Sequence, residues 1–165
     1  MKKIFSEKVS KILSKKRKLE EILRIKITNR GNEVFIDGKS EDEYYAESVI
    51  DAMNFGFSFQ HSILIKTEEF DFEILNIKDY TKRKDLASIR ARIIGKKGKT
   101  LKVLNELTDC FFETNENRVG IIGSPESIKK AQEAVISLIR GSKQANVYSF
   151  LEKNRTKPIL DLGLK

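Results

Sequence analysis

The sequence has a single cysteine, Cys110, two prolines and no tryptophan. One cysteine excludes a disulfide within the chain and is usual in a reducing compartment. No apolar run approaches the roughly 20 residues that a helix needs to span a bilayer. Met1-Lys2-Lys3 resembles the start of a signal peptide, but charged residues recur through Lys18 and no apolar segment follows. We therefore expect a soluble, cytoplasmic protein.

Residue sets that carry catalysis or hold metals are also scarce. The only histidine, His61, has no cysteine or acidic partner at the spacing of a metal site. No Ser/His/Asp set and no pair of buried acids is visible in the pattern. A histidine in this position is more often structural than functional. The sequence therefore predicts no enzyme, no metal and no cofactor.

Charge, in contrast, is abundant and unevenly distributed over the 165 residues, which carry a net charge of +8. Residues 1–30 hold 11 Lys and Arg against three acids, and residues 82–102 hold nine against one. Between them, residues 31–81 hold 12 acids against three Lys and Arg. Clustered positive charge is typical of proteins that bind polyanions. The alternative for either cluster is an ordinary solvated surface.

The second basic cluster contains the motif Ile93-Ile94-Gly95-Lys96-Lys97-Gly98-Lys99-Thr100. Apolar spacing predicts one helix before the glycines and another after them. Glycine lets the backbone turn sharply and approach a ligand closely. Lysines at the start of the second helix add positive charge where free backbone N–H groups already favour anions. The motif therefore suits a ligand that carries phosphate.

Three interpretations of this motif compete. Gly98-Lys99-Thr100 matches the end of a P-loop, but the first glycine of that pattern would fall at Ile93. A GXXG loop of a KH domain, which clamps single-stranded nucleic acid, fits all four loop residues. An ordinary turn between helices with solvated lysines is the third. The P-loop enzyme is disfavoured by Ile93 and by the order of strands.

The chain also contains an internal repeat. Ser14-Lys15-Lys16-Arg17-Lys18 aligns with residues 95–99, and Gly38 and Gly56 align with Gly123 and Gly141. The offset grows from 81 to 85 residues between the two blocks. A tandem duplication predicts a first domain with its connector at 1–66, a second domain at 67–144, and a C-terminal helix and tail at 145–165.

Each half is predicted to run strand, helix, loop, helix, strand, strand, helix. Ser6 is expected to cap the first helix, and Ser40 with Glu43 to form a capping box. Asp85 and Ser124 are expected to cap later helices. The remaining expectations are a helical connector over 57–66, a strand over 70–80, a helix over 146–154 and a mobile tail beyond Arg155.

That element order, with GXXG between the first two helices, is similar to the type I KH fold. The chain resembles the archaeal two-KH ribosome-assembly factors related to Partner-of-Nob-one, also called Dim-two. The resemblance covers nearly the whole chain, and it is carried by the order and spacing of several short stretches. These are residues 56–58, 77–80, 92–100, 106–108, 121–126 and 147–152.

The resemblance implies an α+β fold of two tandem type I KH domains, each a three-stranded sheet packed by three helices. It implies binding of single-stranded RNA near the 3′ end of small-subunit ribosomal RNA. Its further implications are contact with the Nob-one endonuclease and with an initiation factor subunit. Ser14–Arg17 lacks both glycines, so the first domain is expected to be degenerate and to bind RNA weakly.

The candidate RNA-binding residues follow from this loop and its surroundings. Ile93, Ile94 and the edge of the strand at 110–114 are expected to form an apolar groove for about four bases, with arginines at its rim. The full set is Arg90, Arg92, Ile93, Ile94, Gly95, Lys96, Lys97, Gly98, Lys99 and Arg118, with Lys15, Lys16, Arg17 and Lys18 as a weaker set. Alternatives are a general KH-type RNA regulator or exosome-like accessory, and a scaffold that has lost RNA binding.

Overall fold

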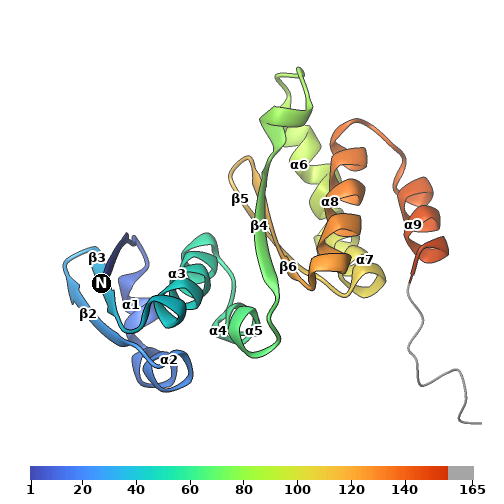
Figure 1. Cartoon of the computed structure of the whole chain (residues 1–165). Helices are drawn as coiled ribbons and strands as arrows, with labels where there is room; N and C mark the ends of the chain where they lie inside the picture. The colour runs from blue at the N-terminus through green and yellow to red at the C-terminus, as the bar shows by residue number, and fades with distance from the viewer. Residues whose placement is uncertain (156–165) are drawn as a thin grey trace, which may run out of the picture.

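The computed structural model describes residues 1–155 and shows two units, each with a three-stranded antiparallel sheet (Figure 1). The strands of the first unit are in the order β1-β3-β2. Its elements are β1 Lys2–Phe5, α1 Val9–Leu13, α2 Lys16–Leu23, β2 Lys26–Arg30, β3 Glu33–Asp37 and α3 Ser40–Phe55. The expected α+β architecture with two three-stranded sheets is confirmed.

Two short helices connect the units, α4 Phe59–Ser62 and α5 Leu64–Thr67. The helical connector expected over 57–66 is therefore present. The N-cap of α4 is Ser58, whose hydroxyl accepts a hydrogen bond from the His61 backbone N–H. This cap satisfies a backbone N–H in the first turn of α4.

The second unit repeats the topology of the first, with strand order β4-β6-β5. β3 begins at Glu33 and β6 at Arg118, which reproduces the 85-residue offset found in the sequence. The elements are β4 Asp71–Asn76, η1 Ile77–Tyr80, α6 Leu86–Ile94, η2 Lys96–Gly98, α7 Lys99–Thr108, β5 Phe111–Asn115, β6 Arg118–Gly123, α8 Pro125–Ile139 and α9 Gln144–Lys153.

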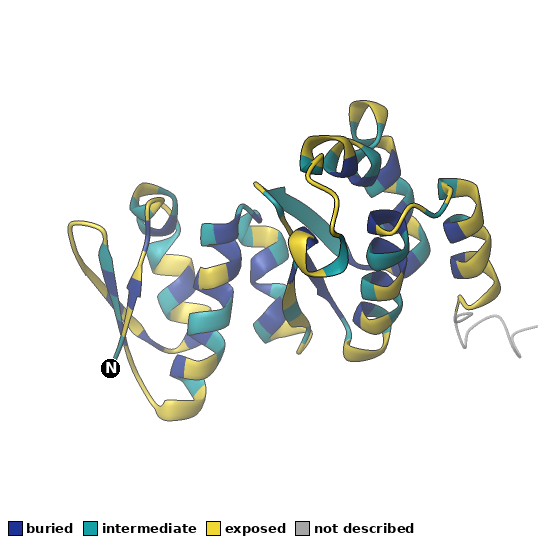
Figure 2. Cartoon of the chain, turned by 90° about the horizontal axis from the view of Figure 1, so that it is seen from above, coloured by how far each residue is buried: buried dark blue, intermediate teal, exposed yellow. Residues whose placement is uncertain are grey.

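Local sequence signals explain where several of these helices begin and which face they bury. The Asp85 carboxylate caps α6 by accepting from Ser88 N–H, and Ser124 caps α8 with Pro125 at its first position. Buried positions recur along α8 every three or four residues, which is the period of a helix with one apolar face. Figure 2 shows helices with alternating buried and exposed stripes in both units.

Three local expectations were wrong. Ser6 does not cap α1, because the N-cap of this helix is Lys8. The Ser6 hydroxyl instead donates to the Asn54 side-chain oxygen and accepts from the Lys8 N–H. The Ser40 capping box does not form, because Ser40 already lies inside α3, and the Glu43 carboxylate accepts from Gly38 N–H at 3.0 Å. The strand expected over 70–80 ends at Asn76, and the mobile tail lies outside the described residues.

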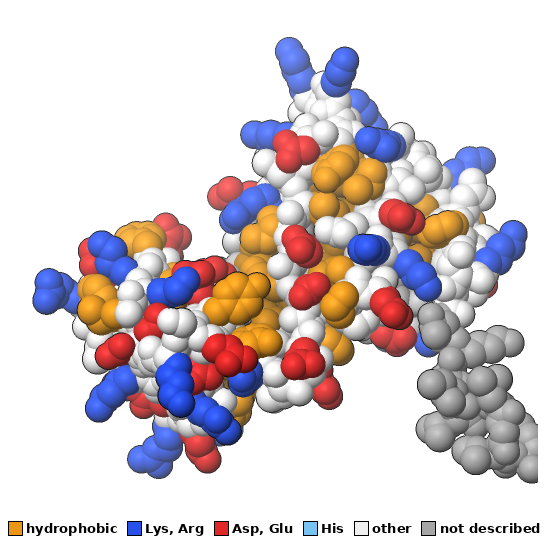
Figure 3. Space-filling model, viewed as in Figure 1, with side chains coloured by type: hydrophobic (Ala, Val, Ile, Leu, Met, Phe, Trp, Pro, Cys, Tyr) orange, Lys and Arg blue, Asp and Glu red, His pale blue; other side chains and the backbone are white. Residues whose placement is uncertain are grey.

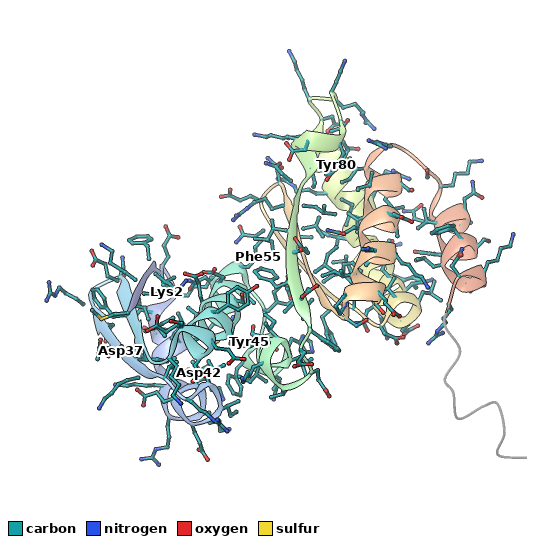
Figure 4. All side chains as sticks on the ribbon, viewed as in Figure 1. Lys2, Asp37, Asp42, Tyr45, Phe55 and Tyr80 are labelled. Carbon is teal, nitrogen blue, oxygen red and sulfur yellow. The ribbon has the colours of Figure 1, made fainter. Side chains whose placement is uncertain are left out.

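The second sheet packs against the first unit through aromatic side chains. Figure 4 shows Phe55, near the end of α3, facing β4. The Phe55 and Phe57 rings each lie about 6 Å from the Phe72 ring, and the Asn115 side chain donates to the Phe55 carbonyl at 3.1 Å. Gly120 leaves the room for Phe55, since a Cβ there would lie 2.7 Å from its ring. The open face of the second sheet is therefore covered by the first unit.

Within the described residues, no helix is both long and apolar enough to cross a membrane.

Candidate nucleic-acid interface

The loop between α6 and α7 adopts a backbone that the sequence permits only because of its glycines. Gly95 has φ 79° and ψ 169°, a region that is essentially restricted to glycine. Lys97 and Gly98 follow with φ of 55° and 76°, both left-handed. The chain thus reverses within four residues and enters α7 directly.

This loop carries the positive charge of the site at the start of a ten-residue helix. Lys96, Lys97 and Lys99 are exposed, and the N-terminus of α7 receives no hydrogen bond from a capping side chain. Uncapped N–H groups and the helix dipole favour an anion here. A hollow of about 660 Å³ opens beside the loop and is lined by Lys96, Lys97, Lys99, Lys102, Val103 and Glu106.

A second hollow, of about 390 Å³, lies between α7 and the edge strand β5. It is bounded by three α7 residues, three β5 residues and one connector residue. These are Leu101, Lys102, Asn105, Phe111, Phe112, Glu113 and His61. Because Lys102 lines both hollows, the loop and the β5 edge bound one continuous surface of α7.

The sequence analysis assigned Ile93 and Ile94 to the walls of the groove, but neither residue lines the two hollows. Ile93 is fully buried in the core of the second unit, so its side chain cannot form a groove wall as expected. Ile94 is half-buried at the end of α6. The apolar contribution to the α7–β5 hollow comes instead from Leu101, Phe111 and Phe112.

The three predicted rim arginines hold other parts of the fold. Arg92 donates to the carbonyls of Leu138 and Ser142 and so fixes the end of α8. Arg90 donates to the Asn117 side chain at 2.8 Å. The Arg118 guanidinium lies 5.3 Å from the centre of the Phe55 ring. The structure therefore does not bring these guanidinium groups together at the loop.

The corresponding loop of the first unit has another shape. Ser14 has helical φ and ψ, Lys15 has φ of −113°, and α2 begins at Lys16, so the turn contains no left-handed residue. The Lys15 ammonium lies 5.7 Å from the Phe59 ring, directed toward the connector. Lys16 is half-buried, whereas Arg17 and Lys18 are exposed on α2. The basic residues remain, but the backbone reversal of the second loop is absent.

Charge is unevenly distributed over the face drawn in Figure 3. On that face acidic side chains gather where α3 meets β4, around a hollow of about 300 Å³ lined in part by Glu69, Asp71 and Glu73. Basic side chains extend from the projecting loop before α6, which includes exposed Lys82, Arg83 and Lys84. A polyanion is therefore disfavoured on the α3–β4 surface.

Sequence reasoning placed the edge of the strand at 110–114 on the groove, and Phe111, Phe112 and Glu113 of that strand do line the α7–β5 hollow. It missed the α7 residues of the hollow and His61. Leu101 and Asn105 are four residues apart on one helix face, which the helical period makes visible. Phe111 and Phe112 alternate across a strand that the sequence did predict. His61 carries no local signal, because its place beside β5 depends on how the connector packs.

The sequence that contains the loop matches a known family. A family model for the second KH domain of PNO1, described as a eukaryotic-type KH domain (KH-domain type I), matches residues 71–156. That range is more than half of the chain and contains the loop with both flanking helices. The chain belongs to the PNO1/Dim2 family of KH proteins. The resemblance seen in the sequence is thus confirmed.

Individual members of the PNO1/Dim2 family are similar over different shares of the chain. "KH domain-containing protein MJ0443" of Methanocaldococcus jannaschii is 32% identical over 68% of this chain and 50% of that protein. "Pre-rRNA-processing protein pno1" of Emericella nidulans is 29% identical over 65% of this chain and 43% of that protein. The chain therefore spans about half the length of the curated relatives it matches, or less.

A solved structure extends the similarity over both units. It is the complex of a/eIF2alpha, aDim2p and rRNA from Pyrococcus horikoshii OT3, whose matched chain is 27% identical to this one. The alignment covers 92% of each chain, with a TM-score of 0.83. The likeness therefore includes the first unit, which the family model does not reach.

Proposed function

We propose that the protein binds single-stranded RNA and acts as an assembly factor of the small ribosomal subunit, without catalysing a reaction. The observation that carries this proposal is the Gly95–Gly98 loop, which joins a glycine-dependent reversal, three exposed lysines and an uncapped helix N-terminus. A GXXG loop in a KH domain clamps the backbone of about four nucleotides. The PNO1 relatives named for pre-rRNA processing support the same assignment.

In this proposal the chain is two tandem type I KH domains, divided as 1–66, 67–144 and a C-terminal segment at 145–165. The equal strand orders of the two sheets support the division. The second domain is the main RNA-binding unit. The first is a platform for it, since residues 14–17 lack the glycines and the left-handed backbone.

The proposed mechanism is binding by charge and shape. Backbone N–H groups at Gly95–Gly98 and the ammonium groups of Lys96, Lys97 and Lys99 hold phosphates, because anions are favoured at a helix N-terminus. Bases then lie along α7 toward the β5 edge, over the surface that Lys102 shares between the two hollows. We do not include Ile93 and Arg92 among the proposed RNA contacts, because Ile93 is buried and the Arg92 guanidinium donates to backbone carbonyls.

The proposed target is the single-stranded 3′ region of small-subunit ribosomal RNA. The proposed protein partners are an initiation factor subunit and the Nob-one endonuclease. The proposed location is the cytoplasm, where the protein would meet ribosomal precursors. The solved complex that contains aDim2p, rRNA and a/eIF2alpha supports the RNA and the first of these partners. A four-nucleotide clamp alone binds weakly, so a neighbouring protein would supply the remaining affinity.

Competition binding and sedimentation test this function together. Purified protein should prefer the 3′-terminal strand of small-subunit rRNA over a shuffled strand of equal length and composition, and duplex RNA should compete poorly. In cell extract the protein should co-sediment with immature small subunits. Equal affinity for both strands, together with absence from subunit fractions, would leave general RNA binding and contradict the assembly role.

A further inference from the structure

The junction of the two units brings together two flat rings that no local motif connects. His61, on connector helix α4, stacks on Phe111 of β5 with ring centroids 3.9 Å apart and planes inclined by 21°. The two residues are 50 positions apart in the sequence. Both residues are half-buried, and Phe111 also packs against the first core.

The stacked pair lies in a hollow whose chemistry suits a nucleobase. Its volume of about 390 Å³ falls within the roughly 300–1,000 Å³ usual for small-ligand sites. Leu101 and Phe112 supply apolar walls, while Lys102 and Glu113 supply charged groups. The Asn105 amide nitrogen donates to the Cys110 carbonyl, which leaves its oxygen as an acceptor for a base edge.

The hollow is also reached from the loop along one helix face. Lys102 lines both this hollow and the one beside the loop. From Lys99 to Asn105 the α7 axis advances about 9 Å, at 1.5 Å per residue. A strand whose phosphates are held at the loop therefore passes the stacked rings within a few nucleotides.

We propose that the His61–Phe111 pair is a stacking platform for a nucleobase of the bound strand, and that the connector therefore completes the RNA site. The proposal rests on the RNA-binding function proposed above and adds a residue outside the KH loop to it. Aromatic rings bind single-stranded bases by stacking, and this binding tolerates different base identities. The base extends the existing stack at its solvent-facing end.

The test is a binding titration of a labelled single strand of about twelve nucleotides from the 3′ end of small-subunit rRNA, which exceeds the clamp length. His61→Ala should weaken binding about tenfold, the usual scale for loss of one stacked base. His61→Phe keeps a flat ring and should bind nearly as the parent does. Gln60→Ala, an exposed neighbour on α4, is the matched control and should change nothing.

A scan of the strand with abasic nucleotides separates stacking from a structural role of His61. An abasic nucleotide at the position that stacks on His61 should weaken binding to the parent protein. The same abasic nucleotide should weaken binding to His61→Ala much less, because two changes that remove one contact are not additive. Additive losses at every position would overturn the platform. So would parent-like binding by His61→Ala. Melting curves of both His61 variants verify that the fold is intact.

The outcome also distinguishes this proposal from the function on which it rests. If the parent binds the strand and Lys96→Asp with Lys97→Asp abolishes binding, the loop function stands whatever His61 does. Loss in the lysine variant with no effect of His61→Ala would refute the platform alone. Unchanged binding in the lysine variant would refute the loop function itself.

Discussion

Gly95 faces the backbone nitrogen of Thr100 so closely that a Cβ at position 95 would lie 2.6 Å from it. That spacing is shorter than a side chain can occupy without movement of the loop or of α7. The other loop glycine differs, since a Cβ at Gly98 would meet no atom within 4 Å. The first glycine is thus required for packing and backbone angle, the second for its angle alone.

We predict that Gly95→Ala lowers both stability and RNA affinity. The variant combines a contact with Thr100 and a backbone region essentially restricted to glycine, which costs on the order of 1–3 kcal/mol by itself. Gly98→Ala should cost about 1 kcal/mol, the usual penalty of a left-handed residue. Urea denaturation of both variants measures the difference. A Gly98→Ala variant less stable than Gly95→Ala would contradict this view of the loop.

The two basic loops should differ in their importance for RNA. Lys96→Asp with Lys97→Asp places two negative charges at exposed positions of the glycine loop, so affinity should fall steeply while the melting temperature changes little. Lys15→Asp with Lys16→Asp is the matched control in the first loop and should weaken binding less. Fluorescence anisotropy with one labelled strand measures both. An equal or larger loss from the first loop would reverse the assignment.

Salt should weaken binding in a predictable way. If the clamp neutralises phosphates, the logarithm of affinity falls linearly with the logarithm of salt concentration, at about −0.7 per phosphate for a single strand. The Lys96/Lys97 double variant should show a shallower slope than the parent, because it forms fewer phosphate contacts. Titrations at several salt concentrations provide both slopes. A flat response of the parent would exclude the lysines as the source of affinity.

Local sequence rules predicted part of the fold correctly, although the caps expected at Ser6 and Ser40 do not form. The caps at Asp85 and Ser124 and the glycine loop were predicted correctly, because each depends on one residue and its immediate neighbours in the sequence. Ile93 could not be placed by the same means, because an apolar residue at a helix end fits a groove wall and a core equally well. Arg92 and His61 depend on elements 46 or more positions away, which no window of sequence contains.

Glu43 is predicted to make stability depend on pH. The hydrogen bond from Gly38 N–H holds the pKa of this carboxyl below its ordinary value of 4.5. A lowered pKa in the folded state means that the contribution is full above the unfolded pKa and is lost as pH falls through the folded one. Glu43→Gln should therefore cost stability at neutral pH and flatten the acid limb of the profile.

Chemical denaturation at a series of pH values measures this effect. Glu41→Gln, at an exposed position in the same first turn of α3, is the control and should keep the parent profile. A Glu43→Gln profile parallel to that of the parent would show that the Glu43 carboxylate contributes no pH dependence.

Phe55 is predicted to couple the two units into one cooperative fold. Its ring lies against Phe57, Phe72 and Gly120, and it is 5% exposed although it stands at the end of a helix. Truncation of a buried phenylalanine costs about 3–5 kcal/mol, because a cavity remains where the ring was. Most of that loss would fall on contacts between the units, since β4 and β6 provide two of the three neighbours.

Phe55→Ala should therefore separate one unfolding transition into two, or broaden it, as well as lower the midpoint. Calorimetry detects this as a van't Hoff enthalpy that falls below the calorimetric one. Phe150→Ala, on α9 and 41% exposed, removes the same ring at the surface and should leave a single transition. If Phe55→Ala still unfolds in one step, other contacts join the units. RNA affinity should fall as well. The interface around Phe55 holds the connector in place, and the connector positions His61 against Phe111 of the second unit.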